Sequence, residues 1–315
     1  MKLLEACKHA PLLLLALLAA CHDTSDDDWN EQKSTEVNVN RNDTQQEPAL
    51  SRLEFPKVKG GSSIVLIHTT NDRYGINYSV EWDCDKKAQR WSAYQMTQAT
   101  MEQKTSRYYS QTNQYPLDPL LPSLYYLSQD CYWNSGFDHG HMCPSYDRLY
   151  SQEANYQTFF LTNMQPQYKA FNGSLSGSDS YKNAWSPWYK LEGEKGLIRT
   201  AISNVNAETL YVVKGGTIED DQILPKLVKG EMRVPKHFFV ALLLKNKEAF
   251  PYKAVGFWME HKSSYLTNDP LSTYAVNIRQ LEELTGIDFF CNLPDETENR
   301  VETLPIENVK RAWGL

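Results

Sequence analysis

The chain has 315 residues, of which 41% are hydrophobic and 23% are charged, and this composition is typical of an ordinary globular protein with one sizeable core, or at most two. The formal net charge is −7, which excludes a chain that is basic throughout. Nine acidic and five basic residues lie in 22–60, and five acidic and three basic residues lie in 294–315, so the body between them is nearly neutral and can still hold a local basic cleft.

The first 21 residues have the pattern of an export signal rather than of folded structure. Lys2 and Lys8 flank a short basic start, and residues 11–20 form an unbroken apolar run that is too short for a permanent membrane span but fits a signal peptide. The run ends in Leu18-Ala19-Ala20-Cys21, which resembles a bacterial lipobox and predicts cleavage before Cys21 and a lipid anchor on it. The alternative is an ordinary signal peptide followed by an incidental cysteine.

A polar segment follows, from residue 22 to about residue 60. It is rich in Asn, Gln, Asp, Glu and Thr and has no hydrophobic periodicity, so we expect a flexible acidic tether. Its start, with Asp23 and Asp26 to Asp28, is similar to the surface-export signals of some Gram-negative lipoproteins. We therefore expect an exported protein that is anchored to the bacterial outer membrane and exposed at the cell surface. A plain solvated linker is the alternative interpretation of the acidic start.

Strands dominate the predicted body, which runs from about residue 61 to residue 292. Two alternating segments on either side of a turn at 83–90 predict a hairpin, and several apolar runs predict central strands of a sheet. Residues 114–122 contain three prolines and predict a loop. The predicted strands are 64–68, 77–82, 91–96, 158–163, 210–214, 238–244 and 254–259.

Two helices are predicted in the second half of the body. Ser186 and Pro187 have the pattern of an N-cap and a first helical residue, and they precede a helix at 188–192. Residues 272–285 place apolar side chains on roughly one face, and Gly286 ends that pattern. Because there is no internal repeat and no second domain boundary, we expect one mixed α+β domain on a largely antiparallel sheet, with 293–315 as a C-terminal tail.

Four cysteines lie beyond the predicted signal, namely Cys84, Cys131, Cys143 and Cys291. An even number of cysteines in an oxidising compartment permits two disulfides, with three possible connectivities. Free buried thiols are the alternative, and the sequence does not choose between them.

The tetrapeptide Asp138-His139-Gly140-His141 gathers two imidazoles and a carboxylate. Histidine is the usual general base near neutral pH, and an imidazole oriented by a neighbouring carbonyl can deprotonate water for attack on phosphorus. Gly140 permits a backbone geometry or a close approach that other residues resist. Two alternatives stay open for the tetrapeptide taken alone. One is a pair of loop histidines without a role, and the other is a metal cluster of His139, His141 and Cys143, although zinc sites usually have wider spacings.

The surroundings of this tetrapeptide resemble the DNA/RNA non-specific endonucleases, which have the ββα-metal (His-Me finger) fold. Residues 136–145, followed by Asp147 and Arg148, resemble the Asp-Arg-Gly-His signature of that family. Further motifs occur in the family's order. They are a second strand and its exit at 160–167, an asparagine at 171–172, a helix with a Trp before a Leu-Glu pair at 188–192, and a closing helix and turn at 281–290. Residues 234–238 also fit the family pattern. The resemblance spans about residues 75–292, and several ordered motifs are more specific than any one of them.

The resemblance implies a metal-dependent hydrolysis. It makes His141 the general base and Asn172 the one direct protein ligand of a Mg²⁺ ion that otherwise keeps its waters, with Mn²⁺ as a substitute. Glu192 becomes the carboxylate that orients a water on the metal. The ion neutralises the scissile phosphate and stabilises the leaving 3′ oxygen, so that the products carry 5′-phosphates.

The resemblance also implies roles for four further residues. Asn163 is expected to support the loop or the base, and Arg107 is similar to an arginine that clamps phosphate. Asp138 and His139 belong to the catalytic signature itself. His139 stands where the family has an arginine, and a protonated imidazole is a weaker fixed cation than a guanidinium.

Two other departures from the family pattern concern the metal and its carboxylate. Asn172 is separated from the Trp–Leu–Glu helix by about twelve residues more than in the family, so Asn183 is the alternative metal ligand. The family's arginine one helical turn beyond the glutamate is missing, because Gly196 occupies that place. Lys195 or Arg199 is the expected substitute.

These inferences predict a sugar-nonspecific endonuclease that hydrolyses phosphodiester bonds in DNA and RNA with Mg²⁺. A site that grips phosphates has no sequence preference, because phosphate contacts carry no sequence information. One alternative is a catalytically weak surface lipoprotein that binds nucleic acid, which the histidine at position 139 and the inserted stretch would explain. Another is a phosphodiesterase that acts on a different phosphate ester.

Overall fold

The computed structural model describes residues 37–128, 131–173, 186–225, 227–229, 231–264 and 269–315. Its main element is a seven-stranded sheet in the order β1-β2-β3-β6-β7-β8-β9, with all neighbours antiparallel. The strands are β1 (Ser63–Thr69), β2 (Ile76–Asp83), β3 (Ala88–Met96), β6 (Ala207–Gly216), β7 (His237–Asn246), β8 (Tyr252–Glu260) and β9 (Ala275–Val276). The expectation of a mixed α+β fold on a largely antiparallel sheet is confirmed.

Six of the predicted strands form as expected, and the predicted hairpin joins β2 to β3 with Glu81 opposite Trp91. The strand predicted at 158–163 is wrong. Its apolar run is buried, but residues Leu161–Asn163 form a short 3-10 helix, and the Asn163 side chain donates a hydrogen bond back to the Thr158 carbonyl at 2.8 Å. This local turn delays the strand, β5, to Met164–Gln167.

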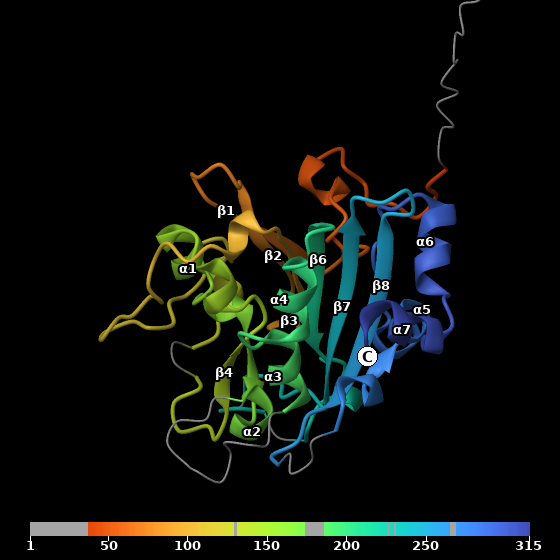
Figure 1. Cartoon of the computed structure of the whole chain (residues 1–315). Coiled ribbons are helices and arrows are strands. Elements are labelled where there is room, and N and C mark those ends of the chain that lie inside the picture. The colour runs from red at the N-terminus through yellow and green to blue at the C-terminus, as the bar shows by residue number, and fades with distance from the viewer. Residues whose placement is uncertain (1–36, 129–130, 174–185, 226, 230, 265–268) are drawn as a thin grey trace, which may run out of the picture. The chain divides into compact units, whose positions relative to one another are not determined.

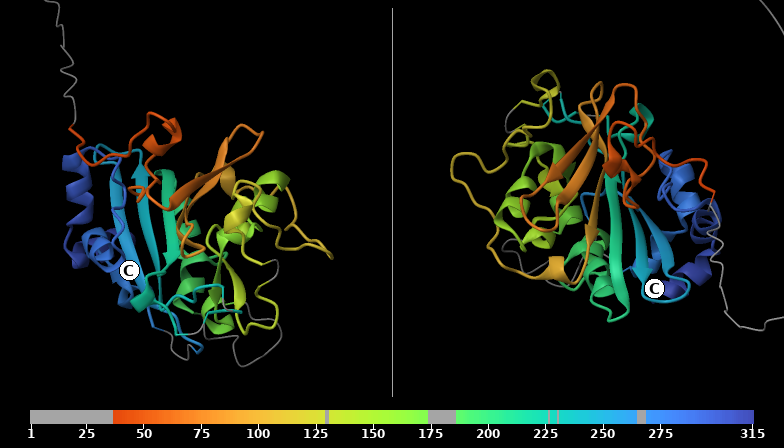
Figure 2. Two further views of the ribbon diagram at one scale, coloured as in Figure 1. Left: turned by 180° about the vertical axis from the view of Figure 1, so that it is seen from behind. Right: turned by 90° about the horizontal axis from the view of Figure 1, so that it is seen from above.

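The second sheet has two strands, β4 (Asp138–His141) and β5, which pair antiparallel with His141 opposite Met164. Seven α-helices accompany the two sheets in the described part of the chain. They are α1 (Gln152–Gln157), α2 (Lys169–Asn172), α3 (Pro187–Glu192), α4 (Leu197–Ile202), α5 (Ile278–Thr285), α6 (Asp295–Glu302) and α7 (Ile306–Trp313). Figures 1 and 2 show β4 and α1 to α4 on one side of the large sheet, and α5 and α6 on the other.

The alternation of β7 side chains shows how the sheet separates two cores. Phe238, Val240 and Leu242 belong to the core that includes α3 and α4. Phe239 and Leu243 point to the opposite face and belong to the core that includes α5 and part of α6. Successive side chains of a strand point to opposite faces, so a continuous apolar run fits a strand that is covered on both sides.

Local signals set the helix ends. The Ser186 hydroxyl accepts a hydrogen bond from the Tyr189 amide at 3.0 Å, which confirms the predicted N-cap of α3. The second predicted helix is shorter than expected. It begins after Asn277, which forms a capping box with Gln280, because the preceding residues form β9 and a short 3-10 helix instead. It ends at Gly286, whose φ is +66°.

The expected boundaries of the body need correction at both ends. Residues 37–60 were expected in the flexible tether, but Phe55 is fully buried and Asn42 donates a hydrogen bond to the Pro56 carbonyl at 3.0 Å. The Asn38 side chain reaches the Cys291 carbonyl at 2.9 Å, so this segment packs against the end of the domain. The expected tail after residue 292 forms α6 and α7. Their apolar residues lay outside the predicted body, and tertiary packing buries them.

The four cysteines Cys84, Cys131, Cys143 and Cys291 are all free and buried, so the two permitted disulfides do not form. Within the ranges described, no helix is long and apolar enough to cross a membrane. The predicted signal, the lipid anchor on Cys21 and the acidic start of the tether lie outside the described residues.

Candidate active site

The short sheet of β4 and β5 presents the tetrapeptide to a cleft of about 640 Å³. Gly140 lies in the middle of β4, where an added Cβ would overlap the buried side chain of Gln167. A glycine is therefore required for Gln167 to lie across the strand. Six of the seven candidate site residues line the cleft, and they are Arg107, Asp138, His139, His141, Asn172 and Glu192. Asn163 does not line it, and Asn183 lies outside the described residues.

His141 has the properties of a neutral imidazole. Burial lowers its pKa well below the usual value, and the nearby Arg107 and His139 act in the same direction. A hydrogen bond with the His139 backbone acts in the opposite direction. The Nε2 atom is buried and has no hydrogen-bond partner among the described residues, so it is available as a proton acceptor at the cleft.

His139 lines the cleft and lies in a stack of rings. Its ring stacks on Tyr115 with a centroid distance of 3.5 Å and an interplanar angle of 5°, and on Tyr132 at 4.1 Å. Burial lowers the pKa of His139 to about 4, so the imidazole is neutral near pH 7. A neutral, stacked imidazole at this position supplies no fixed cation of the kind that the family's arginine gives.

Asn172 is the last residue of α2, and its Nδ2 donates a hydrogen bond to Asp138 Oδ2 at 3.1 Å. With the amide nitrogen engaged, the amide oxygen is the atom that can face a cation. Gly173 follows at φ +71°, where an added Cβ would also lie 2.8 Å from the Tyr189 side chain. The turn that places Asn172 opposite Asp138 therefore depends on glycine.

Glu192 ends α3 and forms a buried ion pair that the sequence did not reveal. Its Oε2 accepts from Lys214 Nζ at 2.5 Å, and the Lys214 ammonium lies 4.7 Å from the centre of the Trp188 ring. Burial raises the pKa of Glu192, and Lys214 opposes that rise. Lys214 is fully buried on β6, 22 residues further along the chain, so only the strand order brings it to Glu192.

Arg199, one of the two expected substitutes for the missing arginine, has a different partner. Its Nη1 donates to Asp147 Oδ1 at 2.8 Å, and its guanidinium lies 4.5 Å from the centre of the Tyr146 ring. The cation that contacts Glu192 is therefore Lys214 and not Arg199.

Arg107 is solvent-exposed at the edge of the cleft, with its guanidinium 4.7 Å from the centre of the Phe159 ring. This position leaves its charge accessible to a phosphate. It is the one Lys or Arg among the described residues that line the cleft, alongside the carboxylates Asp138, Glu192 and Glu194.

Asn163 lies behind the cleft and is fully buried. Its side chain accepts from the Cys143 amide at 2.9 Å and donates to the Cys143 carbonyl at 2.9 Å and the Thr158 carbonyl at 2.8 Å. Its own carbonyl accepts from the Met142 amide at 3.0 Å. These bonds fix the segment that follows His141 to the segment that precedes β5.

The oxygen-rich side of the cleft fits a hard divalent cation. Asn172, Asp138 and Glu192 offer amide and carboxylate oxygens, which Mg²⁺ and Mn²⁺ prefer. A soft site of His139, His141 and Cys143 is not assembled: Cys143 is fully buried and its pKa is raised to about 11 by burial. Among the described residues, these three do not gather their ligand atoms around one point.

Residues 66–296 match the family model of the DNA/RNA non-specific endonucleases. The chain is 30% identical over 185 residues to Nuclease C1 of Cunninghamella echinulata var. echinulata, which covers 57% of this chain and 67% of that protein. It is 24% identical over 232 residues to the mitochondrial nuclease EXOG of Xenopus laevis, covering 71% of this chain and 59% of that one. It is 27% identical over 232 residues to a nuclease of Nostoc sp., and the match covers 72% of this chain and 75% of that protein.

A solved structure has a similar fold. A chain of the EndoG/EndoGI complex superposes with a TM-score of 0.55 at 18% sequence identity, and the match covers 74% of this chain and 89% of that chain. At this identity the likeness concerns the fold alone. Together with the family match, this likeness confirms the expected ββα-metal fold. In this chain β4 and β5 are followed along the sequence by α2 and α3.

Proposed function

The chain belongs to the DNA/RNA non-specific endonuclease family, and from that premise we propose that it hydrolyses phosphodiester bonds in both DNA and RNA, with His141 as the general base. The observation that carries the proposal is the buried, unpartnered Nε2 of His141 at a cleft that also holds Asn172 and Glu192.

In the proposed reaction a water molecule attacks phosphorus and transfers a proton to His141 Nε2. The bond between phosphorus and the 3′ oxygen breaks, and the 3′ oxygen leaves with a proton from water. The products then carry a 5′-phosphate and a 3′-hydroxyl. The lowered pKa of His141 keeps the ring ready to accept that proton at neutral pH.

A divalent cation, Mg²⁺ or Mn²⁺, would neutralise the scissile phosphate and stabilise the charge on the leaving oxygen. Asn172 would hold it through the amide oxygen, and Glu192, fixed by Lys214, would orient its water. The charge of the cleft supports a cation requirement. Once Glu192 is paired with Lys214, Asp138 and Glu194 outnumber Arg107, so the protein alone repels a phosphate.

We also propose that the protein is exported and anchored to the outer membrane through lipid on Cys21, with its catalytic domain at the cell surface. The support is the apolar run that ends in Leu18-Ala19-Ala20-Cys21. Mass spectrometry of the protein isolated from membranes tests this: an acylated N-terminal Cys21 is expected, and an unmodified one would contradict the anchor.

The function is tested with purified protein on supercoiled plasmid and on single-stranded RNA, with Mg²⁺, Mn²⁺ or a chelator. Cleavage of both substrates with either metal, and none with the chelator, is expected. Intact nucleic acid with every metal, together with a stable mobility shift, would instead indicate the nucleic-acid-binding alternative. The neutral His139 gives that alternative its physical basis, because it removes a fixed cation. Faster turnover of bis(p-nitrophenyl) phosphate than of DNA would indicate a different phosphodiesterase.

A further inference from the structure

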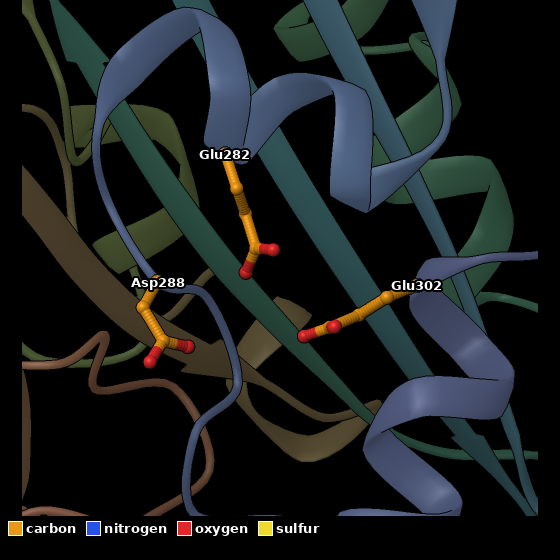
Figure 3. Close-up of side chains that lie close together, drawn as sticks. All are labelled: Glu282, Asp288 and Glu302. Atoms are coloured by element: carbon orange, nitrogen blue, oxygen red, sulfur yellow. The ribbon is translucent and has the colours of Figure 1, made fainter. Parts of the chain in front are cut away.

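Three carboxylates meet on the side of the large sheet opposite the cleft. Glu282 lies on α5, Asp288 in the loop that follows, and Glu302 at the end of α6, and Figure 3 shows their side chains converging on one space. One oxygen from each lies within 4.8 Å of the other two. Oxygen ligands of Ca²⁺ lie about 2.3 to 2.6 Å from the ion, so two of them stand at most about 5 Å apart. The three oxygens therefore fit around one ion.

Glu302 supplies the observation that points to a ligand. Its side chain is 2% exposed, and Oε2 accepts from Arg279 Nη2 at 2.7 Å. Oε1 is buried and has no hydrogen-bond partner in the described part of the chain. Buried polar atoms are almost always paired, and an unpaired carboxylate oxygen is among the most unfavourable groups to bury.

The neighbours of the cluster do not balance its charge. Arg279 contacts Glu282 at 3.1 Å as well as Glu302, but its side chain is 49% exposed. A fourth carboxylate, Glu298, accepts from Asn40 Nδ2 at 2.9 Å, and the same nitrogen donates to Asp288 at 3.1 Å. Asn40 Oδ1 is a second buried acceptor without a partner among the described residues.

We propose that Glu282, Asp288 and Glu302 bind a divalent cation of the calcium class, separate from the cation of the cleft. Several protein oxygens, carboxylates above all, are the ligand set of Ca²⁺, whereas Mg²⁺ keeps most of its waters. Asn40 is tied to this cluster through its Nδ2, which donates to Asp288 and Glu298. The ion would join α5, α6 and the N-terminal segment around Asn40, so it would stabilise this corner of the domain rather than take part in cleavage.

Protonation of the carboxylates is the rival explanation for how the negative charge of this cluster is reduced. Burial, with the neighbouring carboxylates, raises the pKa of Glu302 to about 9 and that of Glu282 to about 7, so protonation also reduces the charge. A proton on one carboxylate reduces the charge but does not draw the three converging oxygens onto one centre as an ion does, and the calcium count and the stability of Glu302→Gln distinguish the two explanations.

The test counts bound calcium and measures stability on the exported form of the chain. The background is Asn172→Ala, which removes the proposed ligand in the cleft. After chelator treatment and dialysis against CaCl₂ at pH 7.5, we expect one Ca²⁺ per chain. We also expect Tm to rise by about 5 °C or more at a hundredfold excess over Kd. Glu302→Gln and Asp288→Asn are each expected to abolish both effects, while Glu283→Gln, an exposed neighbour on α5, preserves them.

Each other result overturns the proposal. No bound calcium with an unchanged Tm, or binding that survives both substitutions, would show that the cluster is not the site. A Glu302→Gln variant more stable than its parent in saturating CaCl₂ would identify protons as the neutralising species. Nuclease activity is measured separately on chains with Asn172 intact. There Glu302→Gln is expected to leave cleavage at 25 °C within twofold of wild type, so failure of the proposed nuclease does not affect this result.

Discussion

Replacing Asn163 by alanine removes the side chain that fixes the segment after His141. The substitution leaves the amide and carbonyl of Cys143 and the carbonyl of Thr158 without their partner. Each buried group left unpaired costs about 1 to 3 kcal/mol, so the loss is expected to be at least about 3 kcal/mol. That is a large part of the roughly 5 to 15 kcal/mol by which a typical domain is stable.

The same substitution is expected to reduce cleavage while the protein is still folded. Asn163 does not line the cleft, but its contacts end two residues from His141. A displacement of about 1 Å at a reacting group lowers the rate by up to about a hundredfold. We therefore expect kcat for plasmid cleavage to fall about tenfold to a hundredfold at 15 °C, with KM little changed. Urea unfolding followed by tryptophan fluorescence measures the loss in the free energy of unfolding.

Two variants control this prediction. Asn163→Asp keeps the shape and one acceptor but cannot donate to the two carbonyls, so it should be destabilised at least as much at pH 7. Asn299→Ala removes an exposed asparagine on α6 and should change the unfolding free energy by less than about 0.5 kcal/mol. If Asn163→Ala cost less than about 1 kcal/mol and kept its activity, the hydrogen bonds described for Asn163 would not be what positions His141.

Three further predictions concern the cleft and its supports. His141→Ala should lower plasmid cleavage by at least about a hundredfold with a retained circular dichroism spectrum and DNA affinity, and near-full activity would refute its role as base. Lys214→Met leaves the Glu192 carboxylate buried without its cation, so both cleavage and Tm should fall, and an unchanged activity would show that this pair does not orient the site. Burial lowers the pKa of His261 to about 4, and its Nε2 accepts from the Tyr168 amide at 2.7 Å, so its contribution to stability is present above pH 6.5 and is lost as the pH falls from 6.5 toward 4. Thermal unfolding measured from pH 7 to pH 4 gives the dependence of the unfolding free energy on pH. This dependence should be weaker in His261→Gln than in wild type, by up to about 1.4 kcal/mol per pH unit. Equal dependences in the two proteins would be inconsistent with this assignment.

Sequence patterns predicted the features that depend on near neighbours in the chain. Apolar runs and two alternating segments located six strands of the large sheet, and the Ser186–Pro187 pair located the start of α3. The motif order around His141 led to the endonuclease family and to six residues that line one cleft. The strand predicted at 158–163 failed because an apolar run also fits a buried turn, and only the hydrogen bonds of Asn163 distinguish the two.

Contacts between distant segments were decided by the tertiary structure alone. Lys214 reaches Glu192 because β6 lies next to β3 in the middle of the sheet, a strand order that no local pattern encodes. Asn40 reaches Glu298, 258 residues away, because the N-terminal segment packs on the last helices. The surroundings of His139 were set in the same way, since the fold stacks Tyr115 and Tyr132 on its ring and burial lowers its pKa to about 4. Residue types and their order along the chain define which groups could do the chemistry. The packing determined their partners and protonation, because burial and charge pairing depend on neighbours that only the folded chain brings together.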